Sequence, residues 1–197
     1  MESQIKHIIL PETKEYGDNN LTNGNKQIKK KEKEKRKVTN NKKWDFHENE
    51  LTSEEQFKYI TIMYNQIKNI NENDNIDERV EHIQNVIKNQ IKTKIQGYHQ
   101  QDIKKKLYDE TKFVSFQKVI ELLYSCKNTC YYCREPVLVL YEYVRDNKQW
   151  SIERRNNSYG HNHDNIEIAC LGCNISRKTM NEERYLFTKQ LNIIKQS

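Results

Sequence analysis

The sequence contains very little alanine, proline or glycine: one Ala, two Pro and five Gly occur among 197 residues. Asn and Ile are common instead, as in chains translated from AT-biased coding sequences. Such a bias raises the number of lysines independently of function. A positive charge is therefore, by itself, weak evidence for a nucleic-acid partner.

The sequence also lacks a long hydrophobic run. No apolar segment approaches the roughly 20 residues of a membrane-spanning helix, so a transmembrane protein is excluded. Residues 1–10 show no small-residue cleavage site behind an apolar stretch of signal-peptide length. We therefore expect an intracellular protein, cytoplasmic or nuclear, that is not secreted. In such a compartment its five cysteines are better explained as metal ligands or free thiols than as disulfides.

The excess of positive charge is confined to the N-terminal segment. Residues 1–44 contain 12 Lys and Arg against 6 Asp and Glu, which accounts for the whole net charge of +6. Few of these residues are apolar and they show no sustained period, so residues 1–44 are predicted to form a disordered basic tail. Such a tail is either an arm for nucleic acid or a nuclear-localisation signal, or else a solvated segment without a specific partner.

Residues 45–112 are predicted to be a helical region. Apolar residues recur at steps of three and four from Phe57 to Ile70 and again from Val80 to Tyr98, which places each set on one helix face. The polar residues 71–75 between the stripes indicate a loop, and Ser53 is the expected N-cap of the first helix. This pattern does not indicate any particular catalytic or binding chemistry. Alternatively, this region is itself the functional part, as a target-recognition or protein-interaction module.

A third helix is expected over residues 115–125, with Ser115 as its cap, and two Cys-x2-Cys pairs follow it. Cys130 with Cys133 and Cys170 with Cys173 are separated by 36 residues. Two such turns supply the four thiolates of a tetrahedral structural zinc site. Gly172 supports the second turn, because a turn before a thiolate often needs a positive φ that glycine adopts at low cost. The alternatives are coincidental spacing or redox-active thiols.

Extended and polar segments alternate between the two cysteine pairs. Residues 136–144 are rich in β-branched and aromatic side chains and, with residues 149–153, predict a β-hairpin. Residues 156–160 indicate a loop, and a helix is expected to begin at the second cysteine pair. A closing helix is expected near the C-terminus, with Asn181 as its cap and Phe187 on its apolar face. The fold class predicted from these elements is α+β.

This order of zinc knuckle, hairpin, polar loop, second knuckle and helix resembles the HNH nuclease family, whose core is a ββα-metal motif. The short motifs lie at Trp150–Asn157, Gly160–His161, Asp164–Ile166 and Cys170–Asn174. Similar stretches occur in HNH proteins of large DNA viruses and phages. The resemblance covers about residues 113–190, and the combined motif is specific although each piece alone is weak. It implies that residues 113–197 form a zinc-containing HNH nuclease-like domain.

The resemblance assigns roles position by position. Glu153 stands where the family has a metal-binding Asp, and Asn174 stands at the last metal ligand. A carboxylate with an amide oxygen suits Mg²⁺ or Mn²⁺. Asn165 matches the middle Asn that holds the loop and orients the catalytic strand. Arg154 stands where the generic family has its general-base His.

The general base must therefore come from elsewhere, because an arginine stays protonated. Arg154 is instead expected to stabilise charge on the phosphate. His161, which follows a glycine as in the viral proteins, is the preferred base, and His163 is a weaker candidate. Either histidine can alternatively be an ordinary loop residue.

The leading prediction is a metal-dependent HNH-type DNA endonuclease of the homing type, with structural Zn²⁺ and catalytic Mg²⁺ or Mn²⁺. The alternative is a zinc-binding DNA-binding or adaptor protein that has lost the chemistry, since Glu-Arg replaces the family's Asp-His. The predicted partner is DNA, with no membrane, and the oligomeric state is not predicted. The residues expected to contact nucleic acid are Arg154, Arg155, Arg177 and Lys178.

Overall fold

The structure is a computed structural model that describes residues 7–10, 36–37, 44–70 and 76–195. Most of the predicted basic tail, and the predicted loop at 71–75, lie outside these residues. Within the N-terminal segment, strand β1 (His7–Leu10) pairs in parallel with β4 (Asn192–Lys195). Lys37 also forms an ion pair with Glu142, with 2.5 Å between Nζ and Oε1. Among the described residues, no helix has the length and apolar character needed to cross a bilayer.

Two helices form most of the N-terminal half. A short 3-10 helix, η1 (Glu48–Leu51), precedes α1 (Ser53–Lys68), and α2 (Glu78–Lys105) follows. The N-cap of α1 is Thr52, whose hydroxyl accepts the Glu55 N–H, so the prediction of Ser53 was wrong by one residue. Helix α2 continues well past Tyr98, the last residue of the predicted stripe.

The predicted apolar stripes of α1 and α2 pack with α3 (Phe116–Ser125) to form one side of the core. Ser115 caps α3 through its hydroxyl, as the sequence predicted. Each fully buried aliphatic side chain of this type stabilises the fold by about 1.5–3 kcal/mol. The side chains with almost no exposure are Ile60, Met63, Ile83, Ile87, Ile91, Val119, Ile120 and Leu123.

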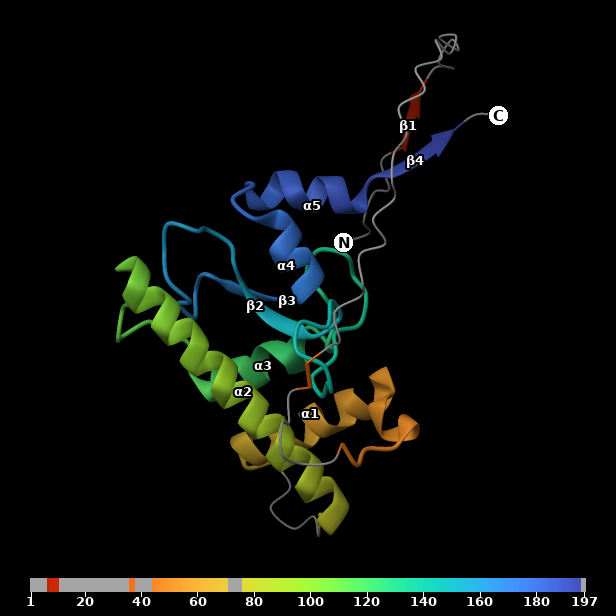
Figure 1. Cartoon of the computed structure of the whole chain (residues 1–197), viewed down its shortest axis with the longest axis vertical. Helices are drawn as coiled ribbons and strands as arrows, with labels where there is room; N and C mark the ends of the chain where they lie inside the picture. Colours follow the sequence, from red (N-terminus) through yellow and green to blue (C-terminus); the bar gives the residue numbers. More distant parts are fainter. Residues whose placement is uncertain (1–6, 11–35, 38–43, 71–75, 196–197) are drawn as a thin grey trace, which may run out of the picture.

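The hairpin of the C-terminal half is formed by β2 (Trp150–Arg154) and β3 (Ile166–Cys170), which are antiparallel. Helix α4 (Leu171–Arg177) follows β3 directly and contacts both strands. The described residues thus form an α+β structure with a small two-stranded sheet beside α4. Figure 1 shows this hairpin at the centre, between α4 above it and α1 to α3 below it.

The prediction of a strand at residues 136–144 was wrong. Most of this segment is buried or half-buried. Leu138 forms an isolated bridge with the backbone of residues 148–150, but beyond it side chains of the helices take the place of a neighbouring strand. The Gln56 amide oxygen accepts the N–H groups of Val139 and Leu140 at 2.7 and 2.9 Å, and the Gln90 amide nitrogen donates to the Tyr141 carbonyl at 3.1 Å. These bonds satisfy the backbone without a ladder.

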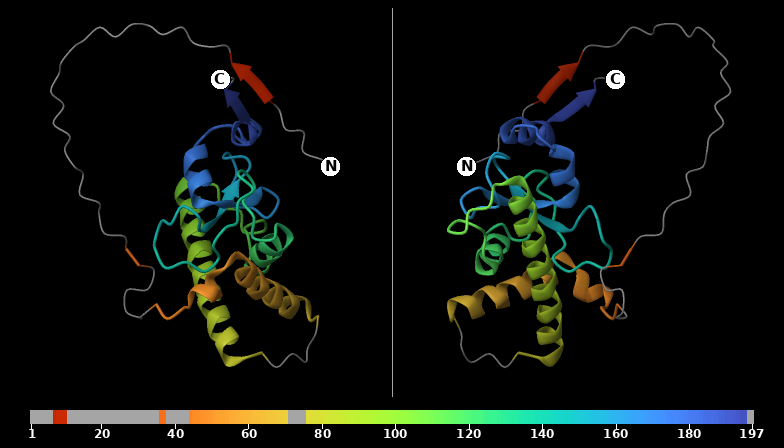
Figure 2. Two further views of the ribbon diagram at one scale, coloured as in Figure 1. Left: turned by 90° about the vertical axis from the view of Figure 1, so that its right-hand side faces the viewer. Right: turned by 60° about the vertical axis from the view of Figure 1, so that its left-hand side comes forward.

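Helix α2 is the long helix in Figure 2 and passes beside the hairpin. Two of its side chains, four residues apart, bond the backbone of β2. Lys94 donates to the Trp150 carbonyl, and the Tyr98 hydroxyl accepts the Ile152 N–H at 3.0 Å. Lys94 also lies over the Tyr141 and Trp150 rings. Its burial lowers the pKa of its amine to about 7.

Asn181 caps the last helix, α5 (Glu182–Gln190), because its side chain accepts the Arg184 N–H at 3.2 Å. The predicted cap is therefore confirmed. The buried residue of α5 is Tyr185, whereas Phe187, expected on the apolar face, is 46% exposed. Tyr185 packs edge-on against Tyr132 of the first cysteine turn, with ring centroids 4.8 Å apart.

Candidate active site

Four cysteines converge beside the hairpin. Cys130 and Cys133 come from the loop after α3, Cys170 ends β3 and Cys173 lies in α4. Their sulfur atoms all lie within 4.8 Å of one another, and the Cys133 and Cys170 sulfurs are 4.0 Å apart. Tetrahedral zinc with bonds of about 2.3 Å places its sulfurs about 3.8 Å apart. The four side chains therefore fit a metal ion such as zinc.

Without a metal ion the Cys130 and Cys173 thiols stay protonated at pH 7. A hydrogen bond with Cys170, together with burial, raises the pKa of Cys130 to about 12, and burial raises that of Cys173 to about 11. Clustered thiols of this kind become thiolates only beside a strong positive charge, which a metal ion supplies. The Cys173 N–H donates to the Cys170 sulfur at 3.3 Å and so orients that ligand.

The positive φ expected at Gly172 is absent. Gly172 lies inside α4, and its N–H donates to the Asn147 carbonyl at 2.9 Å. The left-handed residue is Arg134, with φ of 61°, directly after the first cysteine pair. The cysteines of the second pair are instead presented by the junction of β3 and α4, so no left-handed residue is needed there.

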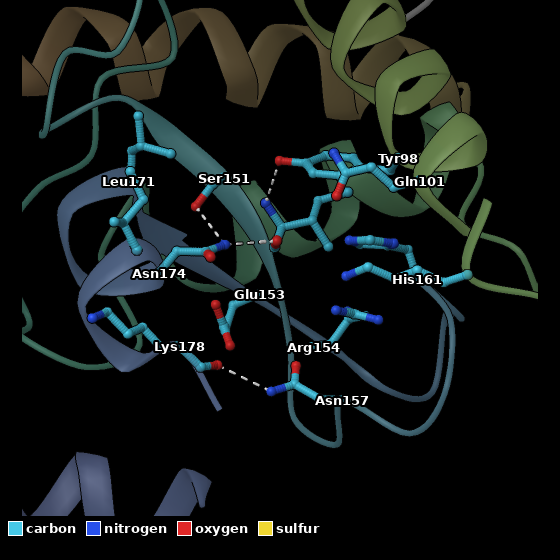
Figure 3. A pocket seen from close by; sticks show the side chains of 13 residues that line it. Tyr98, Gln101, Ser151, Glu153, Arg154, Asn157, His161, Leu171, Asn174 and Lys178 are labelled. Atoms are coloured by element: carbon cyan, nitrogen blue, oxygen red, sulfur yellow. Dashed lines mark hydrogen bonds between the residues drawn. The ribbon is translucent and has the colours of Figure 1, made fainter. Parts of the chain in front are cut away.

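A pocket of about 350 Å³ lies between α2, β2 and α4 (Figure 3). It brings together five residues that the sequence singled out for chemistry, from β2, the loop between the strands, α4 and the residue after α4. Figure 3 shows His161 and Arg154 on one side, Asn174 and Lys178 on the other, and Glu153 between them.

Glu153 lies on β2 and is only 4% exposed. One of its carboxylate oxygens accepts a hydrogen bond from Arg177. Its other oxygen has no hydrogen bond among the described residues. Burial raises the pKa of Glu153 above its ordinary value, against the opposing effect of Arg177.

Asn174 lies on α4, one residue after the last cysteine. Its amide nitrogen donates to the Ile152 carbonyl at 3.0 Å and to the Ser151 hydroxyl at 3.2 Å. These bonds fix the orientation of the amide and leave its oxygen without a donor among the described residues. The oxygens of Glu153 and Asn174 thus remain as possible ligands for a hard cation.

His161 is 4% exposed and stacks on the Tyr98 ring, with centroids 4.5 Å apart. Its Nδ1 lies 2.8 Å from Oδ1 of Asp102, a fully buried carboxylate on α2. Its Nε2 has no hydrogen bond among the described residues. Burial lowers the pKa of His161, and although Asp102 opposes that effect, the net shift is downward. The imidazole is therefore neutral at pH 7 and able to accept a proton. His163 is exposed and does not line the pocket.

The four predicted phosphate contacts separate into two groups. Arg154 and Lys178 line the pocket. Arg155 lies outside it and pairs with Glu182, with Nε 3.1 Å from Oε1. Arg177 is 3% exposed, and besides Glu153 it bonds the Arg154 carbonyl at 2.6 Å. Arg177 is thus buried beneath the pocket and is not available as a surface contact for nucleic acid.

Asn165 does not line the pocket but spans the base of the loop between the strands. Its amide oxygen accepts the Asn156 N–H at 3.0 Å, and its amide nitrogen donates to the carbonyls of Asn156 and Gly160 at 2.9 and 3.1 Å. These bonds hold the loop that carries His161, so Asn165 acts through the backbone.

Sequence reasoning missed the contribution of α2 to this pocket. Tyr98 and Lys105 line it, and Asp102 bonds His161. The available signal was the four-residue spacing of Lys94, Tyr98 and Asp102, which places them on one helix face.

Comparison of the chain with protein-family models, with curated proteins and with solved structures finds no match. The HNH interpretation therefore rests on the motif residues and on the geometry of the pocket.

Proposed function

We propose that this protein is a metal-dependent, HNH-type DNA endonuclease that hydrolyses phosphodiester bonds. The observation that carries the proposal is the convergence of a neutral imidazole, two uncommitted oxygen ligands and two cations on one pocket. The residues are His161, Glu153, Asn174, Arg154 and Lys178.

In this proposal Glu153 and Asn174 hold Mg²⁺ or Mn²⁺. When bound, such an ion would polarise the scissile phosphate and stabilise the leaving oxygen. Nε2 of His161 takes a proton from water, and the water oxygen forms a bond to phosphorus. The bond from phosphorus to the leaving sugar oxygen breaks, and that oxygen takes a proton from solvent. Arg154 binds the phosphate and offsets the charge that develops on it.

The cations around the pocket favour a phosphodiester substrate. Lys105 of α2, Arg154 of β2 and Lys178 after α4 come from three elements and line the same opening. Contacts of this type bind the sugar–phosphate backbone without reading sequence. The cysteine cluster, with zinc bound, would hold α4 against the hairpin and so fix the position of Asn174.

A second candidate function is DNA binding without hydrolysis. It is favoured by the bond between Arg177 and Glu153, because the guanidinium already neutralises the carboxylate that an ion would need. The protein would then be a zinc-containing DNA-binding or adaptor protein.

Nicking of supercoiled plasmid with Mg²⁺ or Mn²⁺ separates the two candidates. The nuclease proposal predicts that His161→Ala lowers the single-turnover rate by about 10²–10⁴-fold, the usual contribution of a general base. Glu153→Ala is expected to abolish metal-dependent cutting. His163→Ala is the matched control, since His163 lies in the same loop but is exposed, and it should cut at the wild-type rate.

A wild-type protein that shifts DNA in a gel but never nicks it would support the second candidate. Cutting of RNA but not DNA would keep the chemistry and change the substrate. Equal loss of activity in His163→Ala and His161→Ala would remove His161 from its role as the base.

A further inference from the structure

Asp102 is a buried carboxylate that lies outside every element of the HNH resemblance. It is on the last turn of α2, its side chain is completely unexposed, and it bonds the loop more than fifty residues further along the chain. Oδ2 accepts the backbone N–H of His161 at 2.6 Å, and Oδ1 lies 2.8 Å from Nδ1 of the same residue. A buried carboxylate is costly to retain unless both oxygens are satisfied, and here one histidine satisfies both.

The chain around this contact is shaped to allow it. A Cβ on Gly160 would lie 2.8 Å from Asp102 Oδ2 and 2.5 Å from the Leu107 carbonyl oxygen, so only glycine permits the loop to approach α2 this closely. On the other side of the loop, the Val114 N–H donates to the His161 carbonyl at 2.9 Å. The backbone of His161 is therefore held from two directions.

The donor and acceptor inventory fixes the tautomer of His161. A carboxylate only accepts hydrogen bonds, so Nδ1 must carry the proton that it donates to Asp102. The lone pair is then on Nε2. The other groups facing this ring are the Tyr98 ring, stacked on it, and the cations Arg154 and Lys105, which disfavour its protonation.

We propose that Asp102 is a positioning residue that holds His161 in the Nδ1–H tautomer and directs Nε2 into the pocket. Its role in catalysis rests on the proposed nuclease function, whereas its effect on the tautomer does not. The helical region 45–112 thereby contributes directly to the site. It supplies the carboxylate that orients His161, which itself comes from the C-terminal half.

Asp102→Asn is the sharpest test, because asparagine has one acceptor oxygen, whereas His161 presents two donors, its backbone N–H and its Nδ1–H. If its oxygen stays on the His161 N–H, its amide nitrogen faces Nδ1 and forces the proton to Nε2. We expect a single-turnover nicking rate at least about 100-fold lower, with unchanged DNA binding. Asp164→Asn is the matched control. Asp164 lies in the same loop with an exposed side chain, and its variant should keep the wild-type rate.

The tautomer is read directly by long-range ¹H–¹⁵N NMR of the imidazole in the full zinc-loaded chain, with His161 assigned from His161→Gln. Wild type should show a protonated Nδ1 and an unprotonated Nε2, and Asp102→Asn should show the reverse. A wild-type Nε2–H tautomer would overturn the proposal without any variant. So would a folded Asp102→Asn protein with an unchanged tautomer. If wild type shows the Nδ1–H tautomer but never cuts DNA, the nuclease proposal fails while the positioning of His161 stands.

Discussion

Glu153 and Arg177 form an ion pair whose side chains are 5% and 2% exposed. A buried pair of this kind adds little stability over a well-packed apolar pair, but removing one partner leaves an uncompensated charge. Arg177 also donates to the carbonyls of Arg154 and Arg155, where β2 ends. The guanidinium therefore fixes the strand that carries the candidate site, and any bound cation must share the carboxylate with it.

Replacing Arg177 with Met should lower the free energy of unfolding by about 3–5 kcal/mol, because Glu153 is left buried and unpaired. Urea denaturation measures this change. Adding Glu153→Gln to the same protein should recover part of the loss, since the uncompensated charge is removed. Arg184→Met, an exposed arginine on α5, serves as the control and should change stability by less than about 0.5 kcal/mol. A loss that small in Arg177→Met would contradict the buried pair.

The protonation of His161 predicts the pH dependence of cutting. Burial lowers the pKa of its imidazole below 6.5, so the base is unprotonated at pH 7 and gains a proton only at lower pH. The single-turnover rate at saturating Mn²⁺ should thus be flat above pH 7 and fall as pH drops below 6.5. His163→Ala should leave this acid limb in place. An acid limb centred above pH 7 would be inconsistent with His161 as the base.

At the scale of elements, α2 is the helix that joins the two halves of the described chain. Its apolar face packs in the core with α1 and α3, while Gln90, Lys94, Tyr98 and Asp102 bond the C-terminal half. Gly97 lies within this helix, is exposed, and has no atom within 4 Å of the place where a Cβ would stand.

Gly97→Ala should therefore stabilise the protein by about 0.5–1 kcal/mol, because glycine is unfavourable in a helix interior and the added methyl meets nothing. Thermal unfolding measures this change. Gly160→Ala should do the opposite and destabilise, since its Cβ would collide with the Leu107 carbonyl. Destabilisation by Gly97→Ala would indicate a contact at this position that the structure does not show.

Local patterns predicted the helices better than the sheet. The caps at Ser115 and Asn181 bond residues only three positions further along, so they can be predicted from the local sequence. The strand expected at residues 136–144 failed because its backbone partners, Gln56 and Gln90, are distant polar residues on helices. Strand composition indicates burial, but it does not identify which groups satisfy the backbone.

At the scale of the whole molecule, the cysteine cluster connects the loop after α3 to the junction of β3 and α4. Zinc analysis should give one ion per chain, and removing it with a strong chelator should lower the melting temperature, because binding free energy at such a site is folding free energy. Cys173→Ser should lower zinc content and melting temperature together. Cys126→Ser is the control, since Cys126 lies outside the cluster and should keep one zinc. Full stability without metal would contradict a structural site.

The candidate site was predictable only where its residues are close in sequence. Glu153, His161 and Asn174 lie within 22 residues of one another and follow a motif, so the sequence alone brought them together. Arg177 was misplaced because a basic residue on a short helix gives no sign of its burial. Asp102 was missed because its partner lies 59 residues away. Its spacing from Lys94 and Tyr98 places it on the same helix face but does not identify that partner.

The site depends on the number of residues between Lys94, Tyr98 and Asp102, because this spacing sets the direction in which each side chain leaves the helix. One residue inserted between Tyr98 and Asp102 would advance the carboxylate by about 1.5 Å and rotate it by about 100° around the axis. Asp102 would then face away from the imidazole, while Lys94 and Tyr98, which precede the insertion, would keep their bonds to β2. An insertion of four residues would bring the carboxylate back near the right face, but about 6 Å too far along. The stretch from Lys94 to Asp102 should therefore tolerate changes in side chain far better than changes in length.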